Sequence, residues 1–296
     1  TDSGFAAQSF YSLDLMMLRT CGVCFSYDNG KMIQTKYYPE SFSLPEPIVN
    51  TNGLEREEFH KFVSLTRVQA EIESAKEVIE QSKPEAFFID GSLILHPMDK
   101  PGSDSKLKNE YHKTILAFIS LYKTAEKNKC VLIGAVEDSR STRLSEWIHT
   151  NMLNEVGNNT VLHDAPLLDK VLGAGQRSCA FTFAESGERH PILMDFPTEW
   201  GEKIHACYIK PSHWDFPLRI EFLSDGKNLT QDANRAAEIA CAQSCIHKEY
   251  AFPSVLIEAD LRAGLKQEEV ELVSDKIFSK LGRNSIRARR RDRRPF

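Results

Sequence analysis

The stretch PEAFFIDGSL, residues 84–93, joins a short apolar run to an aspartate. The residues before Asp90 are typical of an interior strand, and Gly91 and Ser92 follow the acid at once. A carboxylate at the carboxyl end of an interior strand lies where ligands bind in open α/β sheets. The stretch therefore predicts a buried strand that presents a functional acid. For an isolated Asp-Gly-Ser tripeptide, a simple turn is the competing explanation.

Helical and strand patterns alternate on both sides of this stretch. Apolar stripes at helical spacing predict helices over 55–82 and 105–128, and CVLIGAVED (130–138) is a second interior-type strand that ends in acids. Asn29-Gly30 predicts the turn of a hairpin over 16–38. We also expect a loop at 39–53, strands at 179–184, 190–195, 203–210 and 218–224, and helices at 141–153, 165–172, 230–247, 254–263 and 267–281. This order predicts one α/β domain over 1–282, a mixed sheet flanked by helices.

The charge is distributed unevenly along an otherwise ordinary globular composition. Residues 283–296 carry seven arginines against one aspartate, whereas the other 282 residues have a net charge of −11. We expect a separate basic tail at 283–296, either a disordered solubilising end or a contact for nucleic acid or an acidic protein surface. No apolar run approaches the roughly 18–20 residues of a membrane span, so no membrane partner is expected.

The seven cysteines are scattered and odd in number, which argues against a complete disulfide framework and favours a reducing cytoplasm. Cys21 and Cys24 have zinc or redox spacing, and Cys241, Cys245 and His247 could complete a metal site. The first pair lies in an apolar strand pattern, however, which favours core cysteines over zinc ligands.

A second acid opens the chain in Thr1-Asp2-Ser3-Gly4. We expect native residues before Thr1, including a strand that leads into Asp2. If Asp2 and Asp90 end adjacent strands, their carboxylates meet at one edge of the sheet and repel each other. A divalent cation removes that conflict, because hard oxygen ligands suit Mg²⁺ or Mn²⁺.

A third acid is expected from the helix over 55–82. Glu71 lies at the edge of the apolar stripe of that helix, at about 100° of rotation per residue, whereas Glu73 faces solvent. Glu71 is therefore the better candidate for a metal ligand.

Segments along nearly the whole chain resemble the NurA nucleases, which process DNA ends together with the ring-shaped ATPase HerA. These segments are Asp2-Ser3-Gly4, RVQAEIESA (67–75), FFIDGSL (87–93), VLIGAVEDSRSTRL (131–144), DAPLLDKVLGAGQRS (164–178), CYIKP to PLRIEF (207–222) and YAFPSVLIEAD (250–260). The resemblance implies a ribonuclease-H-like fold akin to the Piwi nuclease domain. It also implies a site with two Mn²⁺ or Mg²⁺ ions, a homodimer, and a HerA-type hexameric translocase as partner.

Carried over residue by residue, the resemblance implies Asp2, Glu71 and Asp90 as acidic metal ligands. Asp260 falls where the family has a late histidine, and because an aspartate can also ligate a metal, Asp260 is the expected fourth ligand. Asp164, a further acid at a patterned position, ranks below the first three and is the alternative fourth acid. In such a site two cations stabilise the attacking and leaving oxygens of the phosphodiester, and a metal-bound water is the nucleophile.

Four arginines are candidate DNA contacts: Arg140, Arg143, Arg177 and Arg219. A turn role explains Arg177 equally. For Arg219 we exclude a pair with Glu221, because both residues share one strand and one face. A partner elsewhere on the sheet is then its structural alternative.

The function implied by the resemblance is DNA end resection in double-strand break repair, by a 5′–3′ exonuclease, with single-strand endonuclease activity left open. Since the acidic body would repel DNA, we expect a translocase to thread the DNA, in preference to a locally basic channel. The tail 283–296 is a candidate docking element. The rivals are a NurA-like scaffold without activity and an actin- or sugar-kinase-like phosphotransferase, for which GAGQRS (173–178) comes near a phosphate loop.

Overall fold

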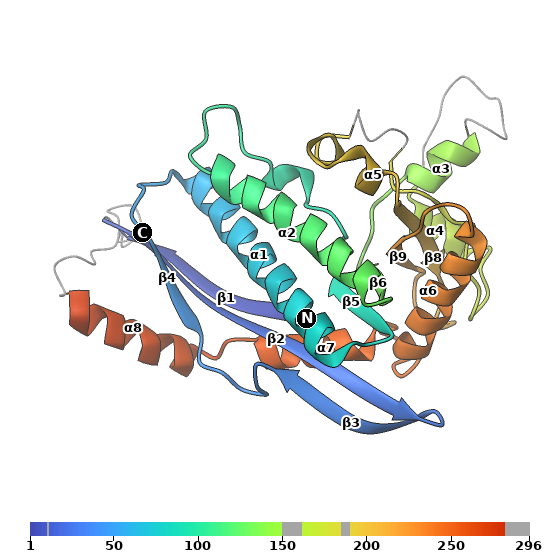
Figure 1. Cartoon of the computed structure of the whole chain (residues 1–296), viewed down its shortest axis with the longest axis horizontal. Coiled ribbons are helices and arrows are strands. Elements are labelled where there is room, and N and C mark those ends of the chain that lie inside the picture. The colour runs from blue at the N-terminus through green and yellow to red at the C-terminus, as the bar shows by residue number, and fades with distance from the viewer. Residues whose placement is uncertain (11, 150–161, 185–189, 282–296) are drawn as a thin grey trace. The chain divides into compact units, whose positions relative to one another are not determined.

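The computed structural model describes residues 1–10, 12–149, 162–184 and 190–281, and they form two compact units. The first unit contains Thr1–Val78, His96–Leu121 and the chain from Glu258, and the second contains Ile79–Leu95 and Tyr122–Ile257. Each unit has a sheet of its own (Figure 1). The basic tail at 283–296 lies outside the described residues, so the predicted boundaries 1–282 and 283–296 stay predictions.

The sheet of the first unit is antiparallel, and its long second strand pairs with the other three. Its strands are β1 (Asp2–Ser9), β2 (Asp14–Asp28), β3 (Lys31–Tyr38) and β4 (Glu46–Asn50). The predicted hairpin is confirmed: β2 and β3 meet at Asn29 and Gly30, whose φ angles are 48° and 76° (Figure 1). One prediction is wrong, since β4 occupies part of the loop predicted at 39–53. The expectation of native residues before Thr1, with a strand that leads into Asp2, stays a prediction.

Helices α1 (Arg56–Ser82), α2 (Lys108–Lys127), α7 (Ser254–Ala263) and α8 (Gln267–Leu281) confirm four predicted helices. On α1 the predicted stripe is buried, since Ile72 and Ala75 are almost inaccessible to solvent. Helix α8 also packs on the first sheet, where its Val273 contacts Leu15 and Met17 of β2. Arg19 of β2 joins the chain at the start of α8 to the sheet, because it pairs with Glu269 at 3.0 Å.

The sheet of the second unit is mixed, in the order β5-β6-β9-β8-β7. Its strands are β5 (Ala86–Asp90), β6 (Val131–Val136), β7 (Phe181–Thr182), β8 (Ile204–Ile209) and β9 (Leu218–Leu223). The helices of this part are α3 (Arg143–Ile148), α4 (Asp164–Asp169), α5 (Thr198–Gly201) and α6 (Leu229–Ser244). β5 and β6 are parallel, whereas β9 runs antiparallel to β6 and to β8, and β7 antiparallel to β8. Small side chains at helical spacing, among them Ala233, Ala236 and Ala240, let α6 pack closely on Ile220 and Phe222.

The predicted mixed α/β class is confirmed, with two corrections. The described residues form two sheets where one was expected. Asp2 and Asp90 belong to different sheets, so the condition under which their carboxylates would meet, that they end adjacent strands, is not met. A 3₁₀ turn at Leu193–Asp195 stands where a strand was predicted at 190–195. The ribonuclease-H-like assignment stays a prediction.

All seven cysteines are free thiols, and burial raises the pKa of Cys130 and of Cys207 to about 12, so both are protonated and inert. Cys21 is buried as predicted, whereas Cys179 and Cys245 are exposed. Among the helices that the structure describes, none has the length and apolar character needed to cross a membrane.

Candidate functional site

Asp90 ends β5 and is followed by a tight turn that crosses the end of β6. Its side chain is exposed, and its backbone pairs with Ala135 of β6. Gly91 has φ +100°, and its N–H donates to the carbonyl of Ala135 at 2.8 Å. A Cβ on Gly134 would lie 2.8 Å from the carbonyl oxygen of Gly91, so the glycine at 134 allows the turn to approach β6. This geometry presents the carboxylate of Asp90 at the carboxyl edge of the parallel strands.

A buried carboxylate holds this turn in place. Oε2 of Glu221, on β9, accepts hydrogen bonds from Ser92 Oγ at 2.8 Å and from the Leu93 N–H at 2.9 Å. Glu221 is only 1% exposed, so these bonds form away from water, where an unmade bond is costly. The turn after Asp90 is therefore held by a side chain of β9, a strand more than a hundred residues later in the chain.

The same carboxylate pairs with Arg219, which corrects two predictions. Nη2 of Arg219 lies 3.1 Å from Oε1 of Glu221, although we excluded this pair. Residues two apart on a strand share a face, and the Cβ separation of about 7 Å is within reach of an arginine side chain. Arg219 is also buried and lies over the ring of Phe183 at 5.2 Å. Its charge is thus held inside the second unit, where it is not placed to contact DNA.

In the first unit, Glu71 is buried and hydrogen-bonded. Its Oε1 accepts from Ser3 Oγ at 2.5 Å and lies 3.2 Å from Nη1 of Arg67. Glu73 is exposed and pairs with Lys76 at 2.8 Å. The prediction that Glu71 lies at the buried edge of α1 and Glu73 in solvent is therefore confirmed.

Asp2 and Asp260 are associated with the other face of the first sheet. Side chains alternate along a strand, so Ser3 faces α1 while Asp2 shares the face of Gly4. A Cβ on Gly4 would meet the carbonyl of Ala263 at 2.1 Å, which shows that this face packs against the end of α7. Asp260 is exposed and lies one turn before that end. Asp2, which is part of β1, and Glu71, which contacts β1 from α1, thus lie on opposite faces of the first sheet.

Asp164, the alternative fourth acid, has a structural place. It is fully buried, and its carboxylate accepts from the N–H groups of Leu144 at 3.1 Å and Ser145 at 2.8 Å. The hydroxyl of Tyr208 donates to it at 3.0 Å. These three bonds secure the first turn of α3 to β8, and they use the oxygen atoms that a metal would need.

The other candidate arginines differ in how their side chains are engaged. Arg177 donates to Asn234 Oδ1 at 2.8 Å and to the carbonyl of Ser178 at 2.7 Å, which fastens its turn to α6. Arg143 begins α3 and is partly buried, whereas Arg140 is exposed. Arg140 is accordingly the predicted arginine with the most accessible side chain.

No three His, Cys, Asp or Glu side chains are grouped as a metal site requires, within the part of the chain that the structure describes. The cysteines and His247 that were considered for a zinc site, all of them among the described residues, are therefore not grouped as a metal site either. Asp2, Glu71 and Asp260 belong to the first unit and Asp90 to the second. The convergence of these four acids therefore stays a prediction.

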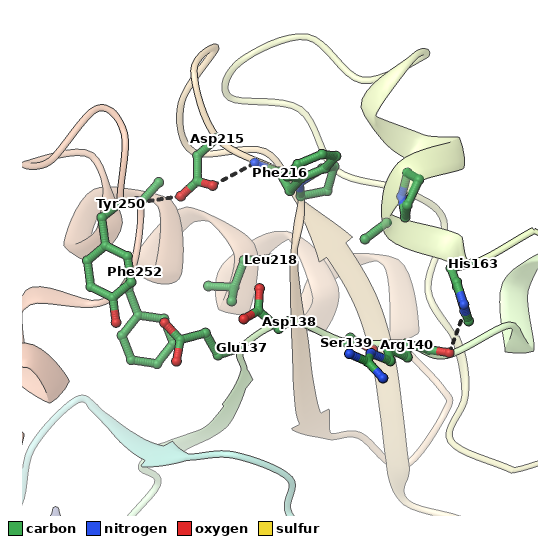
Figure 2. Close-up of a pocket in the computed structure, with 14 residues that line it drawn as sticks. Glu137, Asp138, Ser139, Arg140, His163, Asp215, Phe216, Leu218, Tyr250 and Phe252 are labelled. Carbon is green, nitrogen blue, oxygen red and sulfur yellow. Dashed lines mark hydrogen bonds between the residues drawn. The ribbon is translucent and has the colours of Figure 1, made fainter.

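A pocket of about 480 Å³ opens in the second unit, at the same edge of the sheet as Asp90. The pocket is lined by the residues that follow β6, by those that precede β9, and by the segments at 163–166 and 250–252. Figure 2 shows the rings of Tyr250 and Phe252 on one side, Arg140 and His163 on the other, and Asp138 between them. Sequence reasoning did not find this pocket; its one signal was the pair of acids at the end of CVLIGAVED.

Hydrogen bonds hold the rim of the pocket. Asp215 accepts from the N–H of Phe216 at 2.7 Å and from the N–H of Ala251 at 2.6 Å, so it ties together two loops that carry aromatic rings (Figure 2). On the opposite side, Nδ1 of His163 lies 2.8 Å from the carbonyl oxygen of Arg140. The pocket is therefore formed by mutually supported segments.

A family model, described as the NurA domain, matches residues 17–263. The chain belongs to the NurA domain family. The NurA match includes Glu71, Asp90 and Asp260 and begins after Asp2. No curated protein sequence matches the chain.

Two solved structures are similar to this chain. The crystal structure of the NurA nuclease from Sulfolobus solfataricus has a TM-score of 0.57 and 13% sequence identity, over 96% of this chain and 83% of that one. At this identity the likeness shows a shared fold. The crystal structure of human ENDOV has a TM-score of 0.37 and 12% identity, over 92% of this chain and 84% of that one.

Proposed function

We propose that this protein is a divalent-metal-dependent deoxyribonuclease that hydrolyses phosphodiester bonds. The observation that carries the proposal is the NurA family match, which contains an exposed acid, Asp90, at the carboxyl edge of the parallel strands. The solved relative with the same fold is described as a nuclease. Ligands of open α/β sheets bind at this edge.

The donor chemistry of the proposed ligands fits Mg²⁺ or Mn²⁺. Asp2, Glu71, Asp90 and Asp260 offer hard carboxylate oxygens, which these ions prefer. Carboxylates that bind metals are usually hydrogen-bonded in turn, as Glu71 is to Ser3. Two bound ions would supply charge stabilisation at the phosphate and a water of lowered pKa.

The residues of the chain would orient the substrate and the ligands. The turn braced by Glu221 fixes the backbone that carries Asp90, so this carboxylate needs little rearrangement to bind. The exposed guanidinium of Arg140 is suited to a backbone phosphate, to which arginine donates two parallel hydrogen bonds. Hydrolysis by this route requires no protein nucleophile.

Metal removal tests the proposal directly. We expect the purified chain to cleave linear DNA with Mn²⁺ or Mg²⁺, to stop when a chelator is added, and to resume when the metal is restored in excess. Gel analysis of end-labelled DNA measures the rate. Inactivity with both metals would favour the scaffold, and ATP turnover without DNA cleavage would favour the phosphotransferase.

We further propose that the chain acts as a homodimer with a HerA-type hexameric translocase, in DNA end resection during double-strand break repair. The activity is proposed as that of a 5′–3′ exonuclease, with an additional single-strand endonuclease activity left open. The net charge of −11 outside the arginine-rich tail supports a partner that grips the DNA, because affinity depends on phosphate neutralisation.

The translocase should therefore stimulate cleavage most strongly when DNA is scarce. At subsaturating linear DNA we expect the initial rate to rise when a HerA-type ATPase and ATP are added, and to rise less at saturating DNA. The comparison uses the same nuclease concentration with the ATPase in its ATP-bound and nucleotide-free states. Equal rates with and without the partner would contradict the threading role.

A further inference from the structure

The pocket lies at the same edge of the sheet as Asp90, and Glu137, one of its lining residues, follows β6 directly. Asp90 pairs with Ala135, and Glu137, which lines the pocket, comes two residues later. At the rise of a β-strand this is about 7 Å further along β6. Since β5 and β6 are parallel, the pocket and Asp90 lie at the same edge of the sheet.

The aromatic side chains of the pocket are suited to stacking. Tyr250 is 48% exposed and Phe216 is 61% exposed, so both rings offer a face to a ligand. Tyr250 is accompanied by Phe252, whose ring centroid lies 5.9 Å away. An unpaired base stacks on such rings with a gain of about 1–3 kcal/mol per base.

Most of the charged side chains that line the pocket are negative, and they repel a phosphate. The same carboxylates can accept hydrogen bonds from the edge of a base. Three carboxylates, those of Glu137, Asp138 and Asp215, line it against one guanidinium, that of Arg140. The Asp215 oxygens already accept two backbone N–H groups, so Glu137 and Asp138 are the acceptors that face a ligand. Carboxylates accept from exocyclic amino groups such as N4 of cytosine, whereas thymine presents a carbonyl at that position.

We propose that this pocket binds an unpaired nucleobase of the DNA strand and prefers cytosine or adenine to thymine. Tyr250 and Phe216 stack on the base, Glu137 and Asp138 accept from its amino group, and Arg140 contacts the phosphate at the rim. This inference rests on the proposed nuclease function, to which it adds recognition of a single-stranded end. It would orient the strand so that a phosphate adjoining the bound base reaches Asp90.

Binding measured without cleavage tests the pocket. The full chain, in the presence of a chelator, is titrated into labelled oligo(dC), oligo(dA) and oligo(dT) of equal length at one salt concentration, and fluorescence anisotropy is followed. We expect oligo(dC) and oligo(dA) to bind more tightly than oligo(dT). Tyr250→Ala and Phe216→Ala should each weaken oligo(dC) binding by roughly 5- to 140-fold, the equivalent of one lost stack.

Matched variants separate stacking, base selection and folding. Tyr27→Ala removes a tyrosine of similar exposure, 46%, on the hairpin of the first unit and should leave binding unchanged. Tyr250→Phe keeps the ring and should bind as the wild type does. Glu137→Gln combined with Asp138→Asn should remove the preference for cytosine over thymine while retaining overall affinity. Circular dichroism checks that each variant folds.

The outcomes distinguish this inference from the proposed function. Metal-dependent cleavage without any base preference, and without an effect of Tyr250→Ala or Phe216→Ala on binding, would overturn the base pocket and leave the nuclease intact. Base-selective binding that depends on both rings, in a chain that cleaves with neither metal, would support the pocket and overturn the nuclease.

Discussion

The Asp90→Asn variant should lose metal-dependent DNA cleavage by about 100-fold or more while its fold is retained. Loss of a hydrogen-bond partner of a metal ligand costs about 10–100-fold in affinity or activity. Loss of the charged ligand itself should reach at least the upper end of that range. Because Asp90 is exposed and asparagine has nearly the same size, the substitution should be accommodated without a change of fold. Initial rates on end-labelled linear DNA, measured over a titration of Mn²⁺, provide the readout.

Asp225→Asn is the matched control for this experiment. Asp225 is also exposed and follows a strand of the same sheet, but it comes after β9, which runs antiparallel to β6. It therefore lies at the opposite edge of the sheet from Asp90. We expect the control variant to cleave at the wild-type rate. Unchanged cleavage by Asp90→Asn, or equal losses in both variants, would remove Asp90 from the proposed site.

Local patterns were enough to predict the elements around Asp90. The helix that contains Glu71 has its apolar residues at a period of 3.6, and the hairpin has the Asn-Gly pair that its turn requires. The apolar run before Asp90 has the length and composition of an interior strand, which the structure confirms as β5. In each case the information lies within a few adjacent residues.

Strand pairing between distant segments could not be read in the same way. β1 pairs with β2 through a register that only the folded chain specifies, and its sequence, DSGFAAQS, has few of the residues typical of strands. β6 pairs with β9, some 85 residues later, so periodicity alone could not show that two sheets form. The choice between one sheet and two depends on these nonlocal pairs.

The candidate site was predictable where burial follows from position on a helix, and less so where charges are buried. The position of Glu71 follows from its angle to the apolar stripe of α1. Glu221 was missed as a support for the turn, although a carboxylate in the middle of the apolar strand LRIEFL is itself a signal, because buried acids are paired. The pair with Arg219 was wrongly excluded on the ground that both residues share one face of one strand, since a shared face brings a long arginine side chain within reach of the carboxylate.

The Glu221→Ala variant should lower the free energy of unfolding by about 3–5 kcal/mol. The substitution leaves the buried guanidinium of Arg219 without its carboxylate, and it leaves Ser92 Oγ and the Leu93 N–H without their acceptor. Removing one partner of a buried ion pair is costly because the remaining charge is not solvated. Urea denaturation followed by circular dichroism measures the change.

Two further variants identify the cause of that loss. Glu73→Ala breaks the exposed pair with Lys76 and should cost only about 0–1 kcal/mol. Adding Arg219→Met to Glu221→Ala should recover part of the stability, because no uncompensated charge then stays buried. If Glu221→Ala were as mild as Glu73→Ala, Glu221 would not be the main support of the turn that presents Asp90, and contacts such as the Gly91–Ala135 backbone bond and the Tyr122 hydroxyl on the Leu93 carbonyl would hold it. If the double variant recovered nothing, the loss would come from the Ser92 and Leu93 bonds and not from the charge of Arg219.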